Sequence, residues 1–260
     1  MKQRITFLGT GGSMGIPVIG CGCAVCRSSD PRNKRLRSSL FIEREGKRLL
    51  LDAGPDFREQ ALRYNITGFD ALLLTHGHFD HIGGMDDLRV YNFMENRANL
   101  CFLSKETFDD LIRRFYYFFL PHKQTTESAQ FNFQVLHQNS GTFSVGGIEI
   151  GYFSYFQKEV KVTGFRIGNF AYVTDIREYD RTIFTHLKGV DTLVISALRD
   201  EPSPVHFSFK EGIDFARIAA VKKTYFTHIA HDIDYKSISK SLPEGFHVAY
   251  DGLSIELDDL

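Results

Sequence analysis

The chain has 260 residues, of which 43% are hydrophobic and 24% are charged. These values are ordinary for a folded globular protein, and they exclude a disordered or fibrous chain. The 31 lysines and arginines are balanced by 32 aspartates and glutamates. A bulk cationic surface for nucleic acid is therefore not expected, and an anionic substrate must be attracted by a local feature such as a metal.

The sequence contains no internal repeat and no linker long enough to divide it. Because its length is sufficient to bury a full core, we expect a single domain over residues 1–260. No run of 18 or more apolar residues occurs, so we expect no membrane span. Met1–Arg4 leads into a strand-like run and lacks the apolar core of a signal peptide, which indicates a cytoplasmic location.

Predicted strands and helices alternate along the chain. Apolar and β-branched runs bounded by Gly and Asp predict early strands at Ile5–Leu8, Ser39–Glu43, Arg48–Asp52 and Ala71–Thr75. Helices are predicted at Phe57–Tyr64, Met85–Phe93 and Lys105–Leu120. Strands resume at Phe131–His137, Gly147–Phe156, Thr163–Ile167, Phe170–Thr174 and Thr192–Ser196, followed by a helix at Phe209–Val221, a strand at Lys223–Thr227 and a terminal pair of strands within Phe246–Leu257. This alternation predicts a layered α/β protein.

The segment with the clearest chemistry follows the predicted strand at Ala71–Thr75. It reads His76-Gly77-His78-Phe79-Asp80-His81 and places three imidazoles and a carboxylate within six residues. If these groups were buried separately, each unsatisfied one would cost about 1–3 kcal/mol. A loop at the end of a strand can instead direct them at one point, and Zn²⁺, Mn²⁺ and Fe prefer such ligands. The segment predicts a metal site; the alternative is four separately solvated surface residues.

The pattern His-x-His-x-Asp-His after an apolar strand resembles the signature of the metallo-β-lactamase superfamily. The resemblance extends to Leu50–Gly54, Tyr172–Asp175 and Phe226–His228, and so covers essentially the whole chain. The opening Phe7–Gly12, the motif Gly20-Cys21-Gly22-Cys23-x-x-Cys26 and the late Thr227–His231 narrow it to the PhnP-type phosphodiesterases of the carbon–phosphorus lyase system and their relatives. It implies an αββα sandwich, with two facing mixed sheets, helices outside and a metal cleft at one edge.

The resemblance also implies two divalent metal ions, zinc or manganese, at the active site. The implied ligands are His76 and His78 for one ion, and Asp80, His81 and His228 for the other, with Asp175 bridging the two. Two-metal hydrolysis explains why such a ligand set would be needed. A water that bridges two ions loses its proton near neutral pH and can attack phosphorus. Asp80 and Asp175 are accordingly the first catalytic positions to replace.

One position departs from the family pattern. The pattern places a further His on the first metal, but this chain has Gln157 there, in a strand seven residues before Gly164. An amide oxygen binds Zn²⁺ more weakly than imidazole and suits Mn²⁺ or Mg²⁺ better. Three interpretations stay open: Gln157 is a ligand with an altered metal preference, a water replaces its side chain, or the first metal site is weak. His137 is a less favoured substitute, because it lies one strand earlier.

A second cluster comprises Cys21, Cys23 and Cys26. In a reducing compartment such clustering indicates metal binding or redox chemistry rather than a disulfide. In the family that the chain resembles, a structural zinc takes its fourth ligand from the His three residues after the last active-site His, here His231. The alternatives are a redox trio or free thiols. Cys101 lies in an apolar run and is expected to be a small buried hydrophobe.

His206 lies just before the predicted helix Phe209–Val221. By the resemblance it contacts the scissile phosphate or protonates the leaving group; the alternative is an exposed loop histidine. The Gly-rich segment Gly9–Gly15 lacks the Lys-Ser/Thr of a P-loop, so we expect a tight turn at the rim of the cleft. The five aromatic residues Phe115–Phe119 cannot all face one core if they form a helix. Some of them are therefore expected to contact another element, a lid or a second subunit, and a homodimer contact is one hypothesis.

Taken together, the motifs predict a metal-dependent phosphodiesterase acting on a small phosphodiester, for which a cyclic one is a candidate. A tRNA-processing endonuclease shares the metal motif, but the near-neutral charge and the absence of a long basic arm argue against nucleic acid. A third hypothesis, suggested by Gln157, is a non-catalytic module that binds a metal or a ligand.

Overall fold

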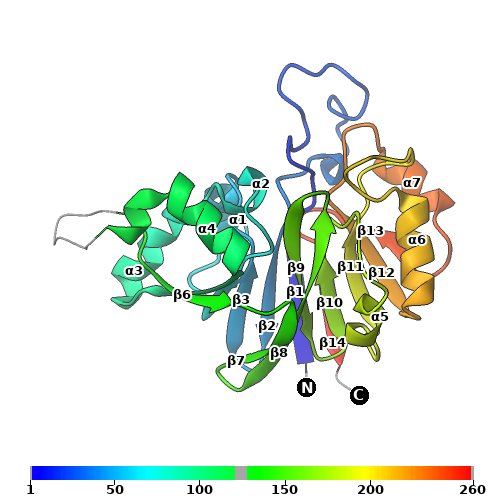
Figure 1. The fold of residues 1–260 in the computed structure, drawn as a ribbon. Helices are drawn as coiled ribbons and strands as arrows, with labels where there is room; N and C mark the ends of the chain where they lie inside the picture. The colour runs from blue at the N-terminus through cyan, green and yellow to red at the C-terminus, as the bar shows by residue number, and fades with distance from the viewer. Residues whose placement is uncertain (1, 121–127, 259–260) are drawn as a thin grey trace.

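Two seven-stranded sheets face each other in the computed structural model, which describes residues 2–120 and 128–258 (Figure 1). In spatial order the first sheet contains β14 (Ser254–Asp258), β1 (Lys2–Gly9), β2 (Ser39–Arg44), β3 (Lys47–Leu51), β4 (Ala71–Leu73), β5 (Asn99–Ser104) and β6 (Phe131–Leu136). The second contains β13 (Phe246–Val248), β12 (Lys223–Thr227), β11 (Thr192–Ser196), β10 (Phe170–Val173), β9 (Val160–Ile167), β8 (Ile148–Gln157) and β7 (Ser140–Val145). The predicted range 1–260 also includes Met1, residues 121–127 and residues 259–260, which lie outside the described residues.

Helices lie on the outer sides of the two sheets (Figure 1). Beside the first sheet are α1 (Phe57–Arg63), α2 (Phe79–Ile82), α3 (Arg89–Glu95) and α4 (Lys105–Arg114), and beside the second are α5 (Ile183–His186), α6 (Phe209–Ile218) and α7 (Tyr235–Ser241). Short 3-10 helices occur at η1 (Pro31–Asn33), η2 (Met85–Leu88) and η3 (Tyr116–Phe119). The predicted αββα sandwich is confirmed. In the described part of the chain, every helix is too short or too polar to span a bilayer.

Each sheet combines parallel and antiparallel strands. Strands β3 to β6 run parallel in the first sheet, and β10 to β13 run parallel in the second. The remaining neighbours pair antiparallel. Side chains alternate between the faces of a strand, so in β3 Leu49 and Leu51 enter the core between the sheets while Leu50 packs beneath the helices. This two-sided burial explains why the parallel strands are continuously apolar.

The aromatic run differs from its prediction. The helix expected over Lys105–Leu120 ends at Arg114, and the chain continues as η3. Phe115 stacks on Phe118 at 5.1 Å between ring centroids, and Phe119 stacks on Phe133 of β6 at 5.2 Å. Packing against the chain's own first sheet therefore ends the helix and accounts for most of the run. The homodimer contact stays a prediction. It loses one supporting argument, because most of the aromatic run packs within the chain itself.

Other differences concern shorter elements. The helix predicted over Met85–Phe93 is divided into η2 and α3, and β7, α5 and α7 were not predicted. The two strands expected within Phe246–Leu257 lie at the edges of different sheets, β13 in the second and β14 in the first. Each of these short elements is determined by contacts with residues that are distant in the sequence. Local sequence patterns therefore do not predict it.

Two glycines allow the loops after β3 and β4 to meet. The backbone N–H of Ala53 donates to the carbonyl of His81 at 2.8 Å, and that of Gly84 donates to Ala53 at 2.9 Å. A Cβ added at Gly54 would lie 2.1 Å from the carbonyl oxygen of Asp80, and one added at Gly84 would lie 2.1 Å from that of Gly54. Only glycine fits such an approach, so these residues fix the loop that carries Asp80 and His81.

Replacing Gly54 by Ala must displace one of these loops. We expect the free energy of unfolding to fall by about 1–3 kcal/mol, as for other overpacked positions. Urea and thermal unfolding measure the change. Gly151→Ala is the matched control, because its added Cβ would lie no closer than 3.6 Å to Arg166. Equal stability of the two variants would show that the close approach imposes no constraint.

Candidate metal centre

Strand ends from both sheets bring the predicted ligands together. His76 follows β4, Asp175 follows β10, His228 follows β12, and Gln157 is the last residue of β8. Polar residues gather at these carboxyl ends because the parallel strands all end at the same edge. Asp52, Asp175 and His228 adopt positive φ values of 61°, 54° and 61°. Such backbone is uncommon outside glycine and concentrates at functional sites.

Asp80, His81 and His228 have ligand atoms close enough together to hold one metal ion, and Asp175 lies beside them. The Nε2 atom of His81 lies 3.3 Å from Asp80 Oδ2 and 3.2 Å from Asp175 Oδ2. His228 Nε2 lies 3.3 Å from Asp80 Oδ2 and 3.4 Å from Asp175 Oδ1. Ligand atoms about 2.0–2.1 Å from a tetrahedral zinc ion stand about 3.3–3.4 Å apart. His81 Nε2 is also buried without an aligned hydrogen-bond partner, so the set fits a divalent cation.

Attraction between these groups outweighs the cost of burying them. Burial alone would raise the pKa of Asp175, but His228 and His81 hold that pKa well below its usual range. Burial would likewise lower the pKa of His81, but Asp80, Asp52 and Asp175 hold it well above its usual range. Asp80 and Asp175 are therefore ionised at neutral pH, as carboxylate ligands of a cation must be.

Asp52 and Thr75 orient His81. Asp52 Oδ2 lies 2.7 Å from His81 Nδ1, and the carboxylate accepts hydrogen bonds from the backbone N–H and the hydroxyl of Thr75, both at 2.8 Å. This contact places the Nδ1 proton toward Asp52 and leaves Nε2 to face the other carboxylates, the usual arrangement behind a metal-binding His. Thr75 is not among the predicted site residues. A signal was present, since Thr directly precedes the predicted ligand in Thr75-His76, Thr174-Asp175 and Thr227-His228.

The predicted ligands of the first metal are assembled less completely. His76 Nε2 lies 2.9 Å from His78 Nδ1. Gln157 reaches the site with its amide Nε2 3.2 Å from Asp175 Oδ1 and 3.1 Å from His206 Nε2. His137, the less favoured substitute, is exposed and follows β6. The structure therefore brings Gln157, and not His137, to the predicted position.

A cleft of about 570 Å³ opens onto this set. Its lining residues include His78, Asp80, Gln157, Asp175, His206 and His228, with Ser13, Lys158, Glu159, Val160 and Val205 around them. Ser13 belongs to the predicted Gly-rich turn, which closes with a hydrogen bond from Gly15 N–H to the Gly12 carbonyl at 2.9 Å. The turn therefore lies at the rim, as predicted. Burial lowers the pKa of His206 to about 4, so its ring is neutral at pH 7.

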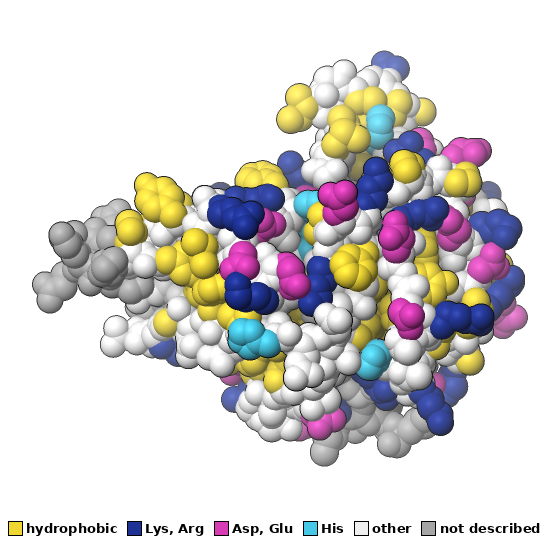
Figure 2. Space-filling model, in the orientation of Figure 1, with side chains coloured by type: hydrophobic (Ala, Val, Ile, Leu, Met, Phe, Trp, Pro, Cys, Tyr) yellow, Lys and Arg dark blue, Asp and Glu magenta, His cyan; other side chains and the backbone are white. Residues whose placement is uncertain are grey.

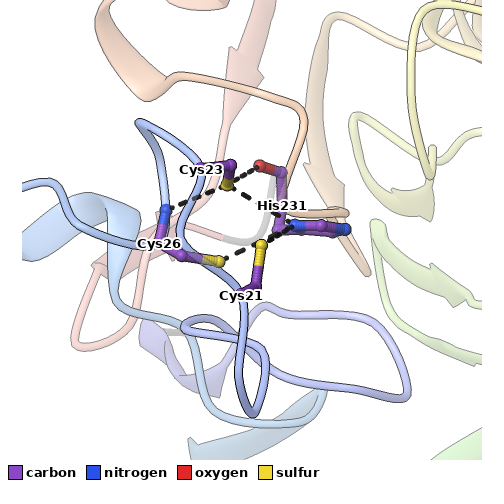
Figure 3. Close-up of side chains that lie close together, drawn as sticks. All are labelled: Cys21, Cys23, Cys26 and His231. Carbon is purple, nitrogen blue, oxygen red and sulfur yellow. Dashed lines mark hydrogen bonds between the residues drawn. The ribbon is translucent and has the colours of Figure 1, made fainter.

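The cysteine cluster lies in a separate loop beside this cleft. Figure 3 shows Cys21, Cys23 and Cys26 directed toward His231, whose Nδ1 atom lies 3.4, 3.6 and 3.7 Å from the three Sγ atoms. A tetrahedral zinc with sulfur and nitrogen ligands at its usual distances separates them by about 3.5 Å. Hydrogen bonds from the Cys26 backbone N–H and from His231 lower the pKa of Cys23 to about 6. The four residues fit a closed zinc site. Cys101 is fully buried elsewhere, as predicted.

Removing one thiolate tests this cluster. We expect Cys23→Ser to lose about one equivalent of zinc per chain and to unfold at a lower temperature, because a closed four-ligand site stabilises the folded state. Elemental analysis and thermal unfolding measure the two effects. Cys101→Ala, which removes a buried thiol outside the cluster, should keep the zinc. Full zinc content in Cys23→Ser would contradict the assignment.

Comparison with known proteins adds family relationships to this geometry. A family model described as the beta-lactamase superfamily domain matches residues 47–229. Over 260 residues the chain is 32% identical to an octanoyltransferase of Porphyromonas gingivalis, covering 99% of this chain and 52% of that protein. Over 98 residues it is 37% identical to a ribonuclease Z of Haloarcula marismortui, covering 36% of this chain and 26% of that protein. The chain therefore spans about half, or less, of these curated relatives.

One solved structure matches the chain along nearly its full length. A diphosphatase of the PhnP family has a TM-score of 0.91 and 37% sequence identity, covering 99% of this chain and 98% of that one. The similarity thus includes both sheets, the helices outside them and the loops at the carboxyl ends of the strands.

Proposed function

This chain belongs to the metallo-β-lactamase superfamily of hydrolases, and from that membership we propose that it is a metal-dependent phosphodiesterase acting on a small phosphodiester. The observation that carries the proposal is the buried set of Asp80, His81, Asp175 and His228, whose contacts of 3.2–3.4 Å suit a divalent cation. The set lies where a cleft opens to solvent, so a substrate can reach it.

The residues divide into holding and orienting roles. Asp80, His81 and His228 would hold one cation, Asp175 would help to hold a second as well, and Asp52 keeps His81 in the required orientation. Divalent cations held there would supply an activated water and positive charge to balance the phosphate oxygens. We propose zinc or manganese in the cleft and a structural zinc at the cysteine cluster.

The cleft itself favours a small phosphate compound. Lys158 lies at its rim, with a positive φ of 52° that turns the chain sharply after Gln157. Its ammonium group adds a positive charge to this rim, beside the negative charge of Glu159, in a chain whose net charge is −1. His206 lines the same cleft, where the sequence predicts contact with the phosphate or the leaving group.

The similar proteins suggest two other classes of substrate. The similar diphosphatase suggests a phosphoanhydride, and the ribonuclease Z relative suggests RNA. On the face seen in Figure 2, lysines and arginines are interspersed with aspartates and glutamates rather than gathered into a basic patch, which favours a small substrate over RNA. The octanoyltransferase name belongs to a protein about twice as long, and we propose no acyl transfer.

Replacing Asp80 tests the chemistry. We expect Asp80→Ala to lower kcat/KM for bis(p-nitrophenyl) phosphate at least about 100-fold, because a metal ligand contributes several kcal/mol to the transition state. Asp214→Asn, on the exposed side of α6, should hydrolyse normally. Unchanged hydrolysis by Asp80→Ala would disprove the mechanism.

The same assay separates the substrate classes. Wild-type rates are compared on a cyclic phosphodiester, a dinucleoside diphosphate and a precursor tRNA, each at low and physiological salt. A small substrate should show little salt dependence, whereas RNA held by several phosphate contacts would lose about 10³-fold in affinity. Preference for the diphosphate or for RNA would replace phosphodiester as the substrate class.

A further inference from the structure

Strand β10 ends at Val173, and the chain then leaves the second sheet to reach Asp175. In the register of its pairing with β9, Thr174 would lie opposite Thr163, two residues beyond the last paired residues. Instead, the backbone N–H of Thr163 donates to the carbonyl of Thr75, which follows β4 of the first sheet, at 2.8 Å. The carbonyl of Thr174 is therefore without the partner that a continued strand would provide.

The hydroxyl of Tyr155 takes the place of that partner. Tyr155 lies on β8, is fully buried, and donates to the Thr174 carbonyl at 2.7 Å. Burial raises the pKa of the Tyr155 hydroxyl well above its usual range, so the group is protonated and donates at neutral pH. Thr174 is itself buried, and a buried carbonyl is costly to leave unpaired. This bond therefore holds the Thr174 carbonyl in place.

The position of this carbonyl controls the direction of Asp175. The Thr174 carbonyl and the Asp175 N–H belong to one planar peptide unit. A fixed carbonyl thus also fixes the plane from which the side chain of Asp175 projects. Asp175 has a positive φ of 54°, and such a conformation persists only where the surrounding structure supports it. The Thr174 hydroxyl adds a second restraint, because it donates to Asp175 Oδ2 at 2.7 Å.

These restraints hold both oxygens of Asp175 against the other side chains of the site. Oδ2 lies 3.2 Å from His81 Nε2. Oδ1 has three nitrogen neighbours at 3.2–3.4 Å, on Gln157, His206 and His228. A carboxylate shared by two cations must fit the geometry of both positions at once. Its orientation therefore matters more than that of a ligand to a single ion.

We propose that Tyr155 and Thr174 are positioning residues for the metal centre, which together direct Asp175 at the cations. Without the Tyr155 hydroxyl, the Thr174 carbonyl needs another donor, and the N–H of Thr163 already bonds to Thr75. The peptide between Thr174 and Asp175 then turns, and the carboxylate turns with it. The inference rests on the proposed function only in that it needs a cation at Asp175, and it is independent of the substrate.

The Mn²⁺ affinity of the cleft tests the role of Tyr155. The full chain, with zinc kept in the cysteine cluster, is titrated with Mn²⁺, and free Mn²⁺ is measured by electron paramagnetic resonance. We expect Tyr155→Phe to bind Mn²⁺ at least about 10-fold more weakly, as for other groups that orient a metal ligand. Tyr91→Phe is the matched control, because the Tyr91 hydroxyl is also buried and donates to the Ile66 carbonyl at 2.7 Å. It should lose similar thermal stability but bind Mn²⁺ normally.

Thr174→Val tests the second restraint and does not depend on the folding of Tyr155→Phe. It removes the hydroxyl that donates to Asp175 and should also weaken Mn²⁺ binding about 10-fold. Thr163→Val is its control, because the Thr163 hydroxyl is buried without a hydrogen-bond partner; its affinity should be unchanged.

Co²⁺-loaded protein gives a spectroscopic readout of the same effect. The ligand-field bands should shift in Tyr155→Phe and Thr174→Val and stay unchanged in both controls, since only the first pair alters the coordination of the ion. Wild-type Mn²⁺ affinity or a wild-type Co²⁺ spectrum in either folded variant would overturn the proposal, even if hydrolysis were lost. Weaker metal binding by these variants, in a chain that cleaves no phosphodiester, would sustain the inference while the proposed function fails.

Discussion

Two carboxylates and two imidazoles, buried together where strands of both sheets end, form the interaction on which the cleft depends. Asp80 and Asp175 remain ionised because His81 and His228 face them at 3.2–3.4 Å. Neither charge could be buried alone at tolerable cost. The left-handed backbone of Asp175 and His228 adds strain of order 1 kcal/mol at each residue. The surrounding sheets must therefore be rigid enough to hold the four groups in place.

Sequence patterns correctly predicted the segments whose conformation is determined by one dominant physical effect. The continuously apolar run Leu49–Leu51 favours a strand buried on both faces. The polar groups of His76–His81, directly after an apolar strand, favour a shared metal over separately solvated side chains. Prediction was wrong where causes compete: the aromatic run Phe115–Phe119 suits a helix locally, but its packing against β6 ends α4 at Arg114. The predicted strand ends placed Asp175 and His228 in the site, although their ligand roles stay predictions.

Some of the site was beyond the reach of sequence patterns. Gln157 and His206 are 49 residues apart, and only the tertiary structure places them on one carboxylate oxygen. The contact of Thr75 with Asp52 has the same character, since 23 residues separate them. Residue types and their spacing thus predicted which side chains belong to the site. Which of these side chains contact one another could be seen only in the structure. The segment Thr227–His231 supplies a residue to each cluster, so the two sites share one loop.

The pairing of β1 with β14 has a consequence for how this chain can be joined to other sequences. In that pair Lys2 lies opposite Asp258, so the first and last described residues are neighbours, and Figure 1 shows both ends at the lower edge of the sandwich. Strand β1 then runs to Gly9, next to the turn that reaches the rim of the cleft. An appended module would thus emerge on the side away from the ligands. The architecture suits gene fusion, because extra sequence at either end leaves the entrance for substrate unobstructed.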